Sequence, residues 1–195
     1  MPFADELGEI QVTLVPYQPR WAVEFQDLAD TLAAALGGLA VAIRHVGSTA
    51  VPGLPAKDVL DLQVEVADVG DPAIAMVMLG LGFRLRPEPW NRSETSFGVS
   101  CAKMVFAPPV GGRPLNIHVR EAGAPNARYA LLFRDFLRGH PDIRDDWGAF
   151  KTRLAGQVDD LMLYGPIKDP ATRILMRLAA RWAEDTGWDG SARPR

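Results

Sequence analysis

The sequence predicts an α+β fold, in which a sheet-containing part (residues 1–122) is followed by a helical part (residues 123–188). Polar and apolar residues alternate in 59–66 and 113–120, which is the period of β-strands. Apolar residues recur every three or four positions in 20–36, as in an amphipathic helix. Beyond residue 125 the pattern is helical, and it predicts helices at 126–138, 143–160 and 170–186.

Local sequence features predict where the helices and strands of the N-terminal part lie. A short strand is expected at 11–15, before the helix at 20–36. A second helix is expected at 71–81, because Asp71 is a good N-cap and Pro72 suits the first helical position. Further strands are predicted at 40–46, 83–86 and near 100–106.

The composition is typical of a cytoplasmic globular protein. The chain has 195 residues, 48% hydrophobic and 23% charged, with a formal net charge of −3. We therefore expect one domain over 1–195, a flexible tail at 189–195 and no nucleic-acid partner. The single cysteine, Cys101, excludes an intramolecular disulfide and favours a reducing compartment. No apolar run reaches the ~18 residues of a membrane span, and the first residues do not resemble a signal peptide.

Two predicted strands each carry one apolar and one polar face. The polar positions are Asp61, Gln63 and Glu65 in the first strand and Asn116, His118 and Arg120 in the second. Alternation alone is typical of an antiparallel sheet with one solvated face, which is the simpler interpretation. The loop before the first strand favours a functional interpretation instead.

This loop combines the features of an anion site. Gly47 permits a turn that brings backbone N–H groups close to an anion, and Ser48 adds a hydroxyl donor. Lys57 supplies a positive charge and His45 precedes the turn, so these four residues are candidates for ligand binding. The glycine spacing excludes a Walker A loop, and the neighbours of Ser48 lack the G-x-S-x-G pattern of a serine nucleophile.

The predicted helix at 126–138 carries charged residues beside its apolar stripe. Arg134 and Arg138 lie one turn apart and could together bind a phosphate or carboxylate. The alternative is a solvated charged face, which the pattern alone favours. The same alternative applies to Lys151 and Arg153.

Three segments together resemble the GrpB family. They are RHVGSTAVPGLPAKDVLDLQVEV at 44–66, LNIHVR at 115–120 and LLFRDFLRGHPDIRDDWGAFKTRLA at 131–155, within a resemblance that spans residues 12–182. The chain departs from the family pattern at Asp58, where proline is more common. The resemblance implies a fold similar to the polymerase-β-type nucleotidyltransferases, with a mixed sheet and helices on one face. Relatives of the family occur fused to dephospho-CoA kinase.

The resemblance also implies roles for individual residues. In nucleotidyltransferases a Gly-Ser after the first strand holds the triphosphate, and carboxylates on neighbouring strands hold two metal ions. Gly47, Ser48 and Asp61 match the Gly-Ser and the first carboxylate. Gln63 stands where the second carboxylate belongs, and His118 is expected at the third position. We expect these strand residues to face a cleft walled by the C-terminal helices.

The missing carboxylate argues against a two-metal site, because two divalent ions need several carboxylates. A single divalent ion, Mg²⁺ or Mn²⁺, could be held by Asp61, Glu65 and His118. An imidazole ligand would favour Mn²⁺ or Zn²⁺ over Mg²⁺.

A metal-free site is equally open. Lys57, Arg120 and Arg134 would then bind an anion, with Asp61 and His118 as the catalytic acid–base pair. The predicted function is to bind a nucleotide or another anionic small molecule and to transfer a phosphate-linked group. The alternative is a non-catalytic ligand-binding module descended from such enzymes. The sequence indicates no membrane partner and no particular oligomeric state.

Overall fold

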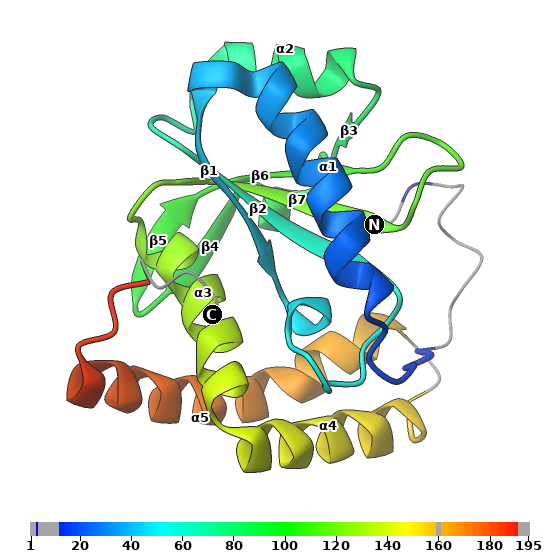
Figure 1. Ribbon diagram of the computed structural model, residues 1–195, viewed down its shortest axis with the longest axis vertical. Coiled ribbons are helices and arrows are strands. Elements are labelled where there is room, and N and C mark those ends of the chain that lie inside the picture. The colour runs from blue at the N-terminus through cyan, green and yellow to red at the C-terminus, as the bar shows by residue number, and fades with distance from the viewer. Residues whose placement is uncertain (1–2, 4–11, 159–160, 191–195) are drawn as a thin grey trace.

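The computed structural model describes residues 3, 12–158 and 161–190, and its centre is a mixed five-stranded sheet (Figure 1). The strand order is β1-β2-β7-β6-β3. The strands are β1 (Ala40–Val46), β2 (Leu60–Val66), β7 (Leu115–Glu121), β6 (Met104–Ala107) and β3 (Arg84–Leu85). Strands β2 and β7 are parallel, and the other neighbours are antiparallel. A separate hairpin pairs β4 (Ser93–Ser96) with β5 (Val99–Ala102).

One face of the sheet is covered by α1 (Arg20–Leu36) and α2 (Pro72–Gly80). As predicted, the Asp71 side chain caps α2 by accepting a hydrogen bond from the backbone N–H of Ala73 at 2.8 Å. The apolar positions of β2 and β7 pack against these helices. The strand residues of this core are Leu60, Leu62, Val64, Val66, Leu115, Ile117 and Val119.

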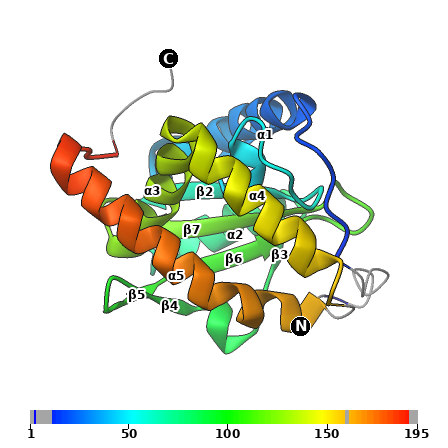
Figure 2. The same cartoon turned by 90° about the horizontal axis from the view of Figure 1, so that it is seen from below.

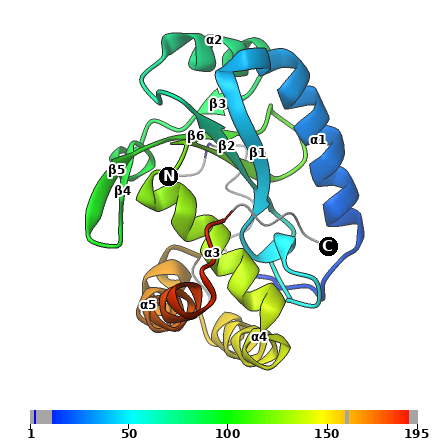
Figure 3. The same ribbon diagram turned by 60° about the vertical axis from the view of Figure 1, so that its left-hand side comes forward.

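The opposite face is covered by three C-terminal helices, α3 (Pro125–Gly139), α4 (Pro141–Ala155) and α5 (Leu161–Thr186). Helix α3 contacts β1, β7 and the β4–β5 hairpin, and α4 and α5 pack on α3 (Figures 2 and 3). The α+β class with a helical C-terminal part is therefore confirmed. The interpretation of the polar face as solvated is wrong, because Gln63 is fully buried and Arg120 is only 7% exposed.

Several predicted boundaries differ in the structure. The strand expected at 11–15 is reduced to an isolated bridge between Val15 and Ala56, and Gln11 lies outside the described residues. The single strand expected near 100–106 is two strands, β5 and β6. Helix α5 begins at Leu161 rather than at 170. Most of the tail predicted at 189–195 lies outside the described residues. None of the described helices is long and apolar enough to cross a membrane.

Candidate anion-binding site

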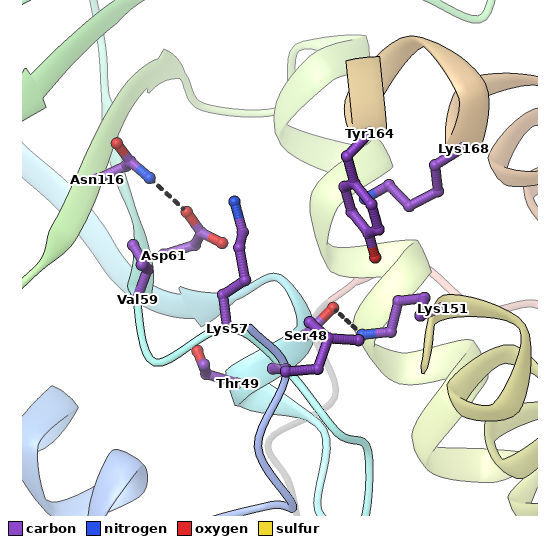
Figure 4. Close-up of a pocket in the computed structure, with 11 residues that line it drawn as sticks. Ser48, Thr49, Lys57, Val59, Asp61, Asn116, Lys151, Tyr164 and Lys168 are labelled. Carbon is purple, nitrogen blue, oxygen red and sulfur yellow. Dashed lines mark hydrogen bonds between the residues drawn. The ribbon is translucent and has the colours of Figure 1, made fainter. Parts of the chain in front are cut away.

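A cavity of about 180 Å³ opens where β1 ends and where β2 and β7 begin, facing α4 and α5 (Figure 4). Its polar lining residues are Ser48, Thr49, Lys57, Asp61, Asn116, Lys151, Tyr164 and Lys168. Three lysines thus surround a single carboxylate. Five of these residues come from the segments 44–66 and 115–120, and three come from α4 and α5, where the sequence predicted no cavity residue.

Gly47 makes the sharp turn between β1 and Ser48. Its φ is +71°, and a Cβ atom at this position would lie 2.5 Å from Oδ2 of Asp61. Both facts favour glycine, because other residues rarely adopt a positive φ and no side chain fits against the carboxylate. The turn therefore places Ser48 beside the start of β2, as expected for this loop.

Two arginines of α3 hold the backbone on either side of this turn. Arg134 donates from Nη1 to the carbonyl oxygen of His45 at 3.0 Å, and Arg138 donates from Nε and Nη2 to that of Ala50 at 2.9 and 2.6 Å. Arg134 also pairs with Asp135 and is only 5% exposed. The prediction that Arg134 reaches the ligand cleft is not supported, because its guanidinium binds protein groups and does not line the cavity. The arginine pair positions the loop.

His45 supports the same turn from within the core. Its ring stacks on Phe25 with the centroids 4.7 Å apart, and Nε2 lies 3.0 Å from Oγ1 of Thr49. Burial lowers the pKa of His45 to about 4, and the positive charge of Arg138 adds to this effect. His45 is therefore neutral at pH 7 and lies behind the loop, outside the cavity lining.

Asp61 and His118 lie on the same face, as the strand pattern predicted. Nε2 of His118 is 3.7 Å from Oδ1 of Asp61, which also accepts a hydrogen bond from Nδ2 of Asn116 at 3.1 Å. Burial alone would raise the pKa of Asp61, but His118, Asn116 and the charge of Lys57 hold it below its usual value. Burial and the charge of Arg120 lower the pKa of His118. At pH 7 the pair is an ionised carboxylate beside a neutral imidazole, and its catalytic role stays a prediction.

The other polar residues of the two strands form a separate buried network. Gln63 accepts a hydrogen bond from Nη1 of Arg120 at 2.7 Å and donates to Glu65 at 3.0 Å, while Arg120 also pairs with Glu94 of β4 at 2.8 Å. Arg120 and Glu65 therefore do not reach the cavity.

The expected metal ligands are not brought together. Glu65 is turned toward Gln63 and Arg44, away from Asp61. Over residues 12–158 and 161–190, no group of three His, Cys, Asp or Glu side chains could hold a metal ion. The positions of Asp61, Glu65 and His118 therefore do not fit a site in which these three side chains hold one metal ion. Binding of one divalent ion stays a prediction, which titration with Mn²⁺ would check.

Lys151 is the cavity residue that the sequence analysis placed on a solvated face. It is 2% exposed, and its Nζ donates to Oγ of Ser48 at 2.9 Å and to the carbonyl oxygen of Pro55 at 2.6 Å (Figure 4). Burial, together with the charges of Lys168 and Lys57, lowers its pKa to about 7. The sequence did carry a signal: Lys151 follows Trp147 by four residues and therefore shares its buried face.

Lys168 and Tyr164 were missed because α5 was expected to start at residue 170. Both lie in the first turns of this helix and line the cavity opposite the start of β2 (Figure 4). Burial lowers the pKa of Lys168, and the charge of Lys57 adds to this effect. The cavity is thus lined by lysine side chains from the loop before β2 and from two C-terminal helices.

A family model described as GrpB protein matches residues 11–177. The chain belongs to the GrpB family. A GrpB protein from Enterococcus faecalis has the same fold, with a TM-score of 0.73 at 23% identity over 91% of this chain and 100% of that one.

Curated relatives of this GrpB-family chain carry different names. It is 35% identical over 96% of its length to a dephospho-CoA kinase of Mycolicibacterium paratuberculosis, and it spans 52% of that protein. It is 33% identical over 74% of its length to the UPF0157 protein BH1888 of Halalkalibacterium halodurans, of which it covers 69%. The chain therefore spans about half the length of the dephospho-CoA kinase relatives. A cytoplasmic RNA terminal U-transferase superposes with a TM-score of 0.49 at 13% identity, which is too weak to assign a function.

Asp58 is hydrogen-bonded by three side chains in the loop beside the cavity of this GrpB-family chain. The carboxylate accepts hydrogen bonds from Arg20 at 2.6 Å, from Nε1 of Trp21 at 2.7 Å and from Arg113 at 2.5 Å. These bonds join the start of α1 and the segment before β7 to the loop that carries Lys57. The carboxylate fixes this loop by hydrogen bonds where a proline would fix it by its rigid backbone.

Proposed function

We propose that the cavity binds the phosphate of a nucleotide or of another phosphorylated small molecule, and that the protein transfers a phosphate-linked group. The convergence of Lys57, Lys151 and Lys168 around one carboxylate carries the proposal. Even with Lys151 neutral, two ammonium groups face the single charge of Asp61, so the cavity retains a positive excess. Lys57, Asp61 and Lys168 are half-buried. An excess charge that is partly shielded from water is costly unless a ligand of opposite charge balances it.

The groups around the cavity have complementary roles in this proposal. Lys57 and Lys168 bind the phosphate oxygens, and Tyr164 is placed to donate a hydroxyl hydrogen bond. Asp61, held by Asn116, is ionised and is the candidate general base, because its low pKa keeps it free of a proton at pH 7. The curated relatives named dephospho-CoA kinase make dephospho-CoA one reasonable ligand, together with nucleoside triphosphates.

A non-catalytic binding module is the second candidate. It is favoured by Gln63, which occupies the position expected for a second carboxylate and is locked in a buried network. Such a module would keep the lysines and bind the same class of ligand. The two candidates differ only in turnover, which ³¹P NMR of each bound phosphate compound would detect.

Isothermal titration with pyrophosphate, ATP and dephospho-CoA tests the binding. Lys57→Met and Lys168→Met should each weaken binding at least about tenfold, because a hydrogen bond to a charged group is worth about 1.5–3 kcal/mol. Arg153→Met is the matched control, since Arg153 is an exposed cation of α4 outside the cavity. Equal affinities in all four proteins would reject an anion site at this cavity.

A further inference from the structure

Ser48 and Lys151 form a hydroxyl–amine pair to which the proposed function assigns no chemical step. Ser48 is half-buried and its side chain lines the cavity, whereas Lys151 lies behind it, almost completely buried (Figure 4). Their Oγ and Nζ atoms are 2.9 Å apart, within the range for direct proton transfer. We propose that Ser48 is a nucleophile that accepts the phosphoryl group covalently, with Lys151 as its general base.

The hydrogen bonds around Nζ suit a neutral lysine. A neutral amine has two N–H donors and one lone pair. One donor can bond the carbonyl oxygen of Pro55, 2.6 Å away, and the lone pair can accept the hydroxyl hydrogen of Ser48. Burial and the nearby cations Lys57 and Lys168 favour this neutral form, so a proton acceptor is ready beside the hydroxyl.

The proposed step balances without a further reactant. Oγ of Ser48 forms a bond to phosphorus as its proton moves to Nζ of Lys151. The bond from phosphorus to the leaving group breaks, and the leaving group takes the electron pair. Lys57 and Lys168 lie in the same cavity and stabilise the charge on the phosphoryl oxygens. Water or an acceptor hydroxyl then attacks phosphorus and gives its proton to the Asp61 carboxylate in the same cavity. The bond from phosphorus to Oγ breaks, and Oγ of Ser48 takes back its proton from Nζ of Lys151.

This pair is consistent with the absence of a G-x-S-x-G motif. That motif belongs to folds in which the serine base is a histidine, whereas a serine–lysine pair is defined by geometry and not by neighbouring residues. Here the base comes from α4, 103 residues after Ser48. The inference rests on the proposed function for its substrate class, but the pair itself stands on the contact between the two side chains.

Labelling with a small alkyl fluorophosphonate tests the nucleophile. The reagent forms an Oγ–P bond and releases fluoride, and peptide mass spectrometry locates the adduct. We expect a single adduct at Ser48, whose rate of formation rises with pH as Lys151 loses its proton. Pyrophosphate should slow it by occupying the cavity. Lys151→Met and Lys151→Arg should slow it at least about 100-fold, the lower end for general-base catalysis. Ser100→Ala, at an exposed serine of β5, should label at the wild-type rate.

The outcomes separate the nucleophile from the binding role. No adduct at Ser48 in the wild-type protein at pH 9, or a rate that does not change between pH 6 and pH 9, would overturn the inference while leaving anion binding intact. An adduct with the expected pH profile in a protein that binds no phosphate compound would support the nucleophile and overturn the phosphorylated substrate. The wild-type pH profile decides the question even where a Lys151 variant fails to fold.

Discussion

Gln63 is an uncharged residue at the centre of the buried polar face between β2 and α3. Its amide oxygen accepts from Arg120 at 2.7 Å, and its amide nitrogen donates to Glu65 at 3.0 Å and to the carbonyl oxygen of Ala127 at 3.3 Å. The amide oxygen thus meets a donor, and the amide nitrogen meets two acceptors. Only an amide can donate and accept in this place, which gives a physical reason for the missing carboxylate.

Changing Gln63→Glu should therefore lower stability and should not create a metal site. One carboxylate oxygen would face two acceptors, Glu65 and the Ala127 carbonyl, and the attraction of Arg120 would only partly compensate. We expect a loss of about 1–3 kcal/mol in the free energy of unfolding, measured with urea. Gln157→Glu, at an exposed position, is the control. A more stable variant, or one that gains tight Mn²⁺ binding, would contradict this account.

Residues of the site could be predicted where their role follows from local sequence. Ser48, Lys57 and Asp61 line the cavity and Gly47 lies against Asp61, because a turn and the start of one strand bring them together. Arg134 could not be assigned, because its partner is a carbonyl group 89 residues away in sequence. A pattern of charges on a helix does not distinguish an arginine that binds a ligand from one that binds the backbone.

Among the secondary-structure elements, α4 depends on a close approach to the loop before β2. A Cβ atom at Gly148 would lie 2.9 Å from Cδ of Pro55, so the proline ring packs directly against the backbone of the helix. Lys151 follows one turn later and reaches both Pro55 and Ser48. The glycine thus positions the lysine.

We expect Gly148→Ala to push α4 away from Pro55 and to separate Lys151 from Ser48. Overpacking costs about 1–3 kcal/mol, against a gain of up to about 1 kcal/mol in helix propensity. Stability should change little or fall, while fluorophosphonate labelling of Ser48 should slow markedly. Gly80→Ala in α2 is the matched control, because nothing lies within 4 Å of its added Cβ and the helix does not contact the loop before β2. If Gly148→Ala were labelled at the wild-type rate, Gly148 would not be needed to position Lys151.

Element boundaries could be predicted where caps and periodicity agree, as for α1 and α2. They could not be predicted for α5, which includes Pro166 and Pro170. Proline removes a backbone donor and normally ends a helix. Here the helix continues through both prolines. Tyr164 is buried at its start, and the helix packs on α3 and α4. Such tertiary contacts cannot be read from the local sequence.

Across the whole molecule, the charges are distributed unevenly, and the composition alone does not show this. The formal net charge is −3, which predicts no general affinity for anions. Yet three lysines from separate parts of the chain meet at one cavity with a single carboxylate. Their convergence depends on the C-terminal helices folding back over the sheet, so the anion site is a property of the tertiary structure.

The cavity should make stability rise with pH above neutrality. The pKa of Lys151 is about 7 in the folded protein, against 10.5 for an ordinary lysine, so between these values the unfolded chain binds more protons. The free energy of unfolding should therefore increase from pH 7 to pH 9, by less than the limit of about 1.4 kcal/mol per pH unit for one group. Lys168, whose pKa is also lowered, contributes with the same sign.

Urea unfolding at pH 7, 8 and 9 measures this slope. Lys151→Met should remove much of it, whereas Arg153→Met should keep it. Pyrophosphate affinity should change in the opposite direction and fall over the same range, because a bound anion favours the protonated lysines. A wild-type stability that is constant or decreases between pH 7 and pH 9 would show that Lys151 keeps its proton in the folded protein, and it could then not act as a base toward Ser48.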